Sequence, residues 1–166
     1  MPMAVELVPP DDNSFLDELQ KAGVCAVIMN IEIWDPNLRT VFCPGKAHIR
    51  RERDLDAIGY AIDKLGRGQV ASVLIAGIQS NSDVIEGAKT LIGLGAVPTI
   101  IPFKPFDDCK MAHFPCTKPA DVLEIYNSVA DLLKQSGLDP GMQKGCTKCG
   151  GCSLENLVKF KKGDMP

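Results

Sequence analysis

Short apolar runs alternate with amphipathic stripes along this chain, and this alternation restricts its fold more than any other feature. The apolar runs occupy residues 4–8, 24–29, 70–77 and 97–102. The run 24–29 is almost continuously apolar, which is typical of a parallel strand covered on both faces. Apolar residues recur at helical spacing over residues 14–22, 57–65, 82–92 and 119–133. Strands that alternate with helices predict a parallel sheet with right-handed crossovers and with functional residues at the carboxyl ends of the strands.

Two connections lack such a pattern and are predicted to be loops. Residues 30–53 contain the only Trp and the turn Cys-Pro-Gly-Lys at 43–46, and residues 103–118 contain Cys109, His113 and Cys116. The chain beyond Gly137 is rich in glycine and cysteine. We therefore expect two parts: an α/β domain over residues 1–137 and a cysteine-rich tail over residues 138–166. Four strands are too few to close a barrel.

Composition excludes several classes of partner. A net charge of −3 and a pI of about 5.4 leave no electrostatic footprint for nucleic acid or for an anionic membrane surface. The N-terminal residues resemble no signal peptide, and no apolar run reaches the roughly 18 residues that a membrane helix needs. We expect a cytoplasmic protein. Its seven cysteines are then expected to be reduced thiols, metal ligands or redox groups, and not a disulfide framework.

The strongest chemical signal is the motif Cys146-Thr-Lys-Cys149-Gly-Gly-Cys152. Three thiolates at this spacing, with glycines between them, match the first three positions of a bacterial ferredoxin run and predict a 4Fe–4S cluster. No fourth cysteine follows, so Cys116, Cys109 or a small molecule would complete the ligand set. A structural zinc site using one more thiolate or His113 is an alternative, and free thiols are another.

A second signal lies where the apolar run 24–29 ends. Asn30 and Glu32 are two residues apart, so in an extended chain they point to the same side, where they can hydrogen-bond ribose hydroxyls or an α-amino group. A polar turn after a strand is the plainer interpretation.

These residues resemble a known family. Asn30-Ile-Glu32 resembles the Asn-x-Asp/Glu element at the end of the fourth barrel strand in radical S-adenosylmethionine (radical SAM) enzymes similar to biotin synthase and lipoyl synthase. The turn 43–46 is similar to one that follows it, and residues 73–78 and 97–103 resemble the fifth and sixth strands. The resemblance covers the C-terminal half of the barrel. It implies that Asn30 and Glu32 contact S-adenosylmethionine or substrate. It also implies that the adenine of S-adenosylmethionine packs against Ile75, Gly77, Ile101 and Phe103.

The resemblance also implies a fold and a function. The expected fold is a partial (β/α) barrel of the TIM type, with about four parallel strands, flanking helices and a cysteine-rich tail. The expected function is binding of S-adenosylmethionine and of an auxiliary iron–sulfur cluster held by Cys146, Cys149, Cys152 and Cys116. The family's Cys-x3-Cys-x2-Cys motif is absent, so catalysis is expected to need a partner polypeptide with the other half of the barrel, and a homo-oligomer is the alternative assembly. A non-catalytic iron–sulfur or zinc protein on a barrel remnant is the alternative function.

Overall fold

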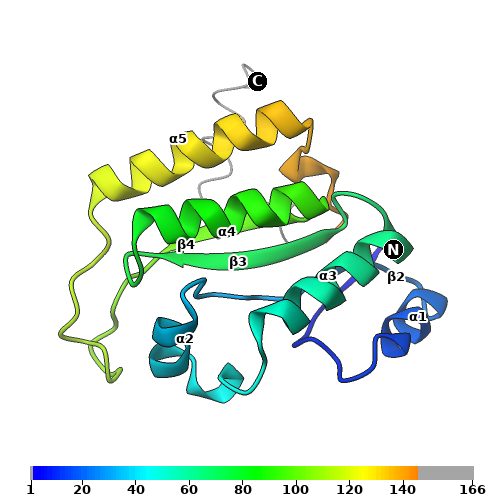
Figure 1. The fold of residues 1–166 in the computed structure, drawn as a ribbon, viewed down its shortest axis with the longest axis horizontal. Coiled ribbons are helices and arrows are strands. Elements are labelled where there is room, and N and C mark those ends of the chain that lie inside the picture. Colours follow the sequence, from blue (N-terminus) through cyan, green and yellow to red (C-terminus); the bar gives the residue numbers. More distant parts are fainter. Residues whose placement is uncertain (1, 146–166) are drawn as a thin grey trace.

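Four parallel strands lie side by side in the order β1-β2-β3-β4 in the computed structural model, which describes residues 2–145 (Figure 1). The strands are β1 (Met3–Glu6), β2 (Val24–Ile28), β3 (Val70–Ala76) and β4 (Val97–Pro102). Each pair of consecutive strands is parallel, because a helical crossover returns the chain to the same edge before the next strand begins. The α/β class and the partial barrel expected from the sequence are confirmed.

The expected helices are present, together with one that the sequence analysis missed. The main helices are α1 (Ser14–Lys21), α3 (Arg51–Leu65), α4 (Asn81–Leu94) and α5 (Pro119–Ser136). The predicted loop 30–53 contains the short helix α2 (Pro36–Phe42) and the 3-10 turn η1 (Pro44–Lys46). Asp35 caps α2 by accepting hydrogen bonds from the backbone of Asn37 and Leu38, and Pro36 occupies the first turn. This cap and proline are a recognised start signal, but a seven-residue helix carries too little periodicity to be detected.

The two faces of the sheet differ in what covers them. A Cβ on Gly87 of α4 would lie 3.1 Å from Leu74 Cδ1, so Leu74 points toward the helices. Because side chains alternate along a strand, Val73 and Ile75 point to the opposite face, and the strand register pairs Ile75 with Ile101 there. Leu74 is fully buried whereas Ile75 and Ile101 are half-buried. We call the side that carries Val73, Ile75 and Ile101 the open face.

The start of the predicted tail packs against the domain. Leu138 is fully buried, and a second 3-10 turn, η2 (Pro140–Met142), follows it. The Gln69 side chain donates to the carbonyl oxygen of Met142 at 2.8 Å and accepts from the backbone of Lys144 at 3.2 Å. The predicted division at residue 138 stays a prediction, and Cys146, Cys149 and Cys152 lie outside the described residues.

Within residues 2–145, no helix is both long enough and apolar enough to cross a membrane.

Candidate functional site

The carboxyl end of β2 is fastened to its neighbours by Asn30. Its side-chain amide nitrogen donates to Glu6 Oε1 at 2.7 Å, and its oxygen accepts from the backbone nitrogen of Val73 at 3.0 Å. Glu6 ends β1 and Val73 belongs to β3, so one side chain bridges both strands that flank β2. Asn30 therefore has a structural role at the end of β2.

Glu32 departs from the extended conformation expected of it. Its φ of 66° lies in the left-handed region, which a non-glycine residue adopts only where its surroundings hold it there. The backbone of Glu32 donates to Val73 O at 2.8 Å and accepts from Ile75 N at 2.8 Å, which fixes it beside β3. The pleat argument that placed Asn30 and Glu32 on one side is therefore wrong, because it required an extended chain.

Asn30 and Glu32 are instead linked by a lysine that hydrogen-bonds both of them. Lys46 Nζ donates to the carbonyl oxygen of Asn30 at 2.9 Å and to Glu32 Oε1 at 2.6 Å. The Lys46–Glu32 ion pair is about one-quarter exposed on both sides, so solvent reaches it. Lys46 comes from η1, in the region that the sequence analysis assigned to a loop, and its role could not be derived from spacing alone.

The second oxygen of Glu32 accepts from Cys43 Sγ at 3.3 Å. Burial, followed by the hydrogen bond to Glu32, raises the pKa of Cys43 to about 11. The thiol is therefore protonated at neutral pH. In that state Cys43 is a hydrogen-bond donor and is poorly suited to act as a nucleophile.

Thr117, a residue that the sequence analysis did not single out, connects the carboxyl ends of β3 and β4. Its hydroxyl donates to Ala76 O at 2.8 Å and lies 3.1 Å from Phe103 O. Gly77 has a φ of 94°, and a Cβ there would lie 2.2 Å from the Thr117 hydroxyl oxygen. Gly77 is therefore required by backbone conformation and by close packing.

The remaining sequence-predicted residues lie on the open face or in the loop that follows β4. Ile75 and Ile101 are register partners, and Phe103 follows β4 and is half-buried. Cys109, His113 and Cys116 are all exposed. Within residues 2–145, no three His, Cys, Asp or Glu side chains are grouped closely enough to hold a metal ion.

The order of the parallel strands and their helical crossovers define a partial (β/α) barrel. Coproporphyrinogen III oxidase from Escherichia coli, described as a radical SAM enzyme, is structurally similar to this chain, with a TM-score of 0.64 and 16% sequence identity. The match covers 82% of this chain and 32% of the oxidase, so the chain spans about a third of the length of that protein. At this identity the likeness shows the fold alone. No family model and no curated protein matches the sequence.

Proposed function

We propose that this chain is the C-terminal half of a radical SAM-type barrel, similar to biotin synthase and lipoyl synthase. In this proposal it binds S-adenosylmethionine along the open face and an auxiliary 4Fe–4S cluster through its tail. A separate polypeptide supplies the other half of the barrel. The shared fold with a radical SAM enzyme supports the proposal.

The observation that carries the proposal is the juxtaposition of polar and apolar groups at the carboxyl ends of the strands. Half-buried Ile75, Ile101 and Phe103 provide apolar surface of the kind that packs against an adenine ring. The carboxylate of Glu32, held by Lys46, is an acceptor for ribose hydroxyls. A nucleoside has both an apolar ring and a polar sugar, so this arrangement is chemically suited to one.

The described residues fit S-adenosylmethionine better than they fit a metal cluster. Of the proposed cluster ligands only Cys116 is described. It is exposed, and among residues 2–145 it belongs to no group of three metal-binding side chains. Cys146, Cys149 and Cys152 lie outside the described residues. In radical SAM chemistry a cluster with an open iron supplies the electron that cleaves S-adenosylmethionine. The motif for that cluster is absent from this sequence, so we assign this chain to binding and orientation of the cofactor.

Calorimetric titration of the anaerobically purified chain with S-adenosylmethionine tests the proposal. Glu32→Gln should weaken binding about tenfold, because a charge-assisted hydrogen bond is replaced by a neutral one. Glu86→Gln on α4, which neutralises an exposed carboxylate on the helical side, is the matched control and should bind like the wild type. Absence of S-adenosylmethionine binding, or equal affinity in Glu32→Gln, would reject the cofactor role.

The cluster is tested separately by metal analysis after anaerobic reconstitution. We expect about four irons with matching sulfide per chain and an absorbance near 400 nm from thiolate-bound iron. Alanine at Cys146, Cys149 or Cys152 should remove that absorbance, and Cys25→Ala in β2 should preserve it. Replacing Cys116 and Cys109 one at a time identifies the fourth ligand. One zinc per chain without sulfide would replace the cluster by a structural zinc site.

One observation favours the alternative, a non-catalytic iron–sulfur or zinc protein. The amide of Asn30 is already used to join β1 and β3, so this residue can be explained without a cofactor. The alternative predicts a metal-loaded chain that does not bind S-adenosylmethionine. The two experiments above therefore separate the two functions.

A further inference from the structure

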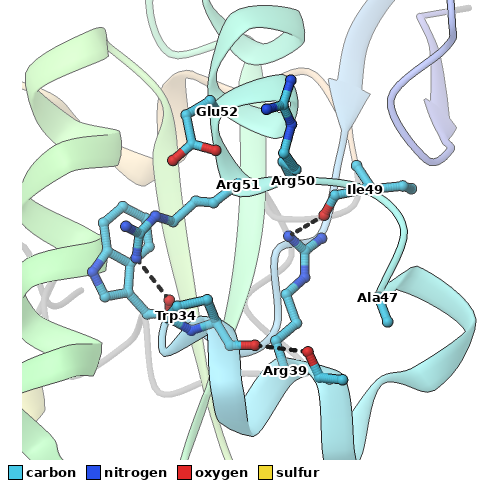
Figure 2. A pocket seen from close by; sticks show the side chains of 9 residues that line it. Trp34, Arg39, Ala47, Ile49, Arg50, Arg51 and Glu52 are labelled. Carbon is cyan, nitrogen blue, oxygen red and sulfur yellow. Dashed lines mark hydrogen bonds between the residues drawn. The ribbon is translucent and has the colours of Figure 1, made fainter.

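A pocket lies between α2 and the beginning of α3, away from the open face. It has a volume of about 300 Å³. Its lining includes Trp34, Arg39, Ile49, Arg50, Arg51 and Glu52 (Figure 2). A Cβ on Gly87 of α4 would lie 3.0 Å from the Trp34 ring, so Trp34 packs in the helical layer. The pocket is therefore separate from the proposed S-adenosylmethionine site.

Arg39 is the unusual residue in this pocket. It is only 4% exposed, and its Nη1 donates to Asp54 Oδ2 at 2.5 Å and to Ile49 O at 3.1 Å. Its Nε and Nη2 atoms are buried and have no hydrogen-bond partner within residues 2–145. A buried charged donor without a partner is destabilising, and such groups are rare unless a ligand or a water satisfies them. The free edge, Nε with Nη2, is a pair of parallel donors suited to two oxygens of one anion.

The rest of the pocket carries more positive than negative charge. Arg51 stacks on Trp34 with its guanidinium carbon 4.4 Å from the ring centre, and it donates to Trp34 O at 2.9 Å, so its charge is held in place. Arg50 is the N-cap residue of α3, a 15-residue helix, and its side chain forms no capping hydrogen bond with the first turn. The amino end of a helix favours an anion. Of the described residues that line the pocket, Glu52 alone is acidic.

We propose that this pocket binds the oxyanion group of a small molecule, a phosphate or a carboxylate. Asp54 already balances the charge of Arg39, so Arg50 and Arg51 supply the charge that attracts the ligand. Because the free edge of Arg39 is buried, binding in this proposal requires the side chain to turn toward the pocket that it lines. Trp34 and Ile49 provide apolar wall for an organic remainder, and the volume exceeds that of the oxyanion itself. The proposal does not depend on the proposed function.

Trp34 allows a direct test, because it is the only tryptophan of the chain and it lines the pocket. The full chain is titrated with inorganic phosphate, with acetate and, at equal ionic strength, with chloride while Trp fluorescence is recorded. We expect a saturable change with phosphate or acetate, and the tighter of the two identifies the oxyanion. Chloride should give no saturable change.

Three variants test which residues bind the anion. Arg39→Lys keeps a cation for Asp54 but loses the bidentate edge, and should weaken binding about tenfold. Arg50→Gln should also weaken it. Glu52→Gln should strengthen binding by removing a like charge, a direction that loss of stability does not produce. Arg67→Gln, beyond the far end of α3, is the matched charge control and should leave the affinity unchanged.

Two results would overturn the proposal. The first is a response to phosphate and acetate no different from that to chloride, which would mean that water satisfies Arg39. The second is an affinity equal to wild type in both Arg50→Gln and Glu52→Gln. The side chains of Arg50 and Glu52 are exposed, so these two variants should fold and remain informative even if Arg39→Lys does not fold. Glu32→Gln should bind the anion normally, so failure of the S-adenosylmethionine proposal leaves this test intact.

Discussion

At the scale of single residues, the end of β3 requires a glycine at position 77, because there is no room for a Cβ beside Thr117. Gly77→Ala should destabilise the chain by about 2–3 kcal/mol, because a left-handed residue gains a Cβ that overlaps Thr117. Urea unfolding followed by circular dichroism measures this cost. Adding Thr117→Ala should recover part of it by removing the overlap. Gly93→Ala on α4, where a Cβ meets no atom within 4 Å, is the control and should be neutral or stabilising.

At the scale of secondary-structure elements, a small polar cluster fastens α1 to α3. Lys64 Nζ lies 2.9 Å from Asp17 Oδ1, and the Tyr60 hydroxyl donates to Asp17 Oδ2 at 3.0 Å. The contact with Lys64, followed by the hydrogen bond from Tyr60, lowers the pKa of Asp17. The contact with Asp17, followed by that with Tyr60, raises the pKa of Lys64. The cluster should therefore be intact between the acidic titration of Asp17 and the alkaline titration of Lys64.

This cluster predicts a pH dependence with a definite sign. A carboxyl whose pKa is lower in the folded state stabilises the fold above its unfolded pKa of about 3.9 and loses that contribution as the pH falls through its folded pKa. The difference in stability between wild type and Asp17→Asn should thus be constant near neutral pH and shrink in acid. Denaturant unfolding at pH 7, 4 and 3 measures it. Glu18→Gln on the same helix is the control, and a difference for Asp17→Asn that persists at pH 3 would contradict the assignment.

At the scale of the whole molecule, the open face predicts association. A four-stranded sheet with half-buried Ile75 and Ile101 on one side exposes apolar area that a complete barrel would cover. We expect the isolated chain to self-associate at micromolar concentration in light scattering. Ile75→Lys should shift the population toward the monomer. Val41→Lys, at an apolar residue of α2 that is 68% exposed, should not. A monodisperse wild-type monomer would remove the reason for a partner half.

The sequence determined the order and type of the main elements. Strong helical periodicity predicted α5, whose apolar positions recur along 18 residues. Continuous apolar runs predicted β2 and β3. The fold class followed, because parallel strands joined by helices have few arrangements. Such patterns are local, and each is repeated often enough along an element to be recognised. Short helices such as α2 lack that repetition.

The tertiary structure decided the contacts that define the candidate sites. The left-handed backbone of Glu32 depends on the neighbouring strand. The ion pair of Glu32 with Lys46 and the close approach of Thr117 to Gly77 join residues that are far apart in sequence. The same holds for Arg39, an ordinary basic residue in the sequence, which becomes a buried donor only because Asp54 and Ile49 close around it. Burial and partner choice are properties of the packed chain, since they arise when distant segments exclude water together. Residue spacing along the sequence therefore does not predict burial or partner choice.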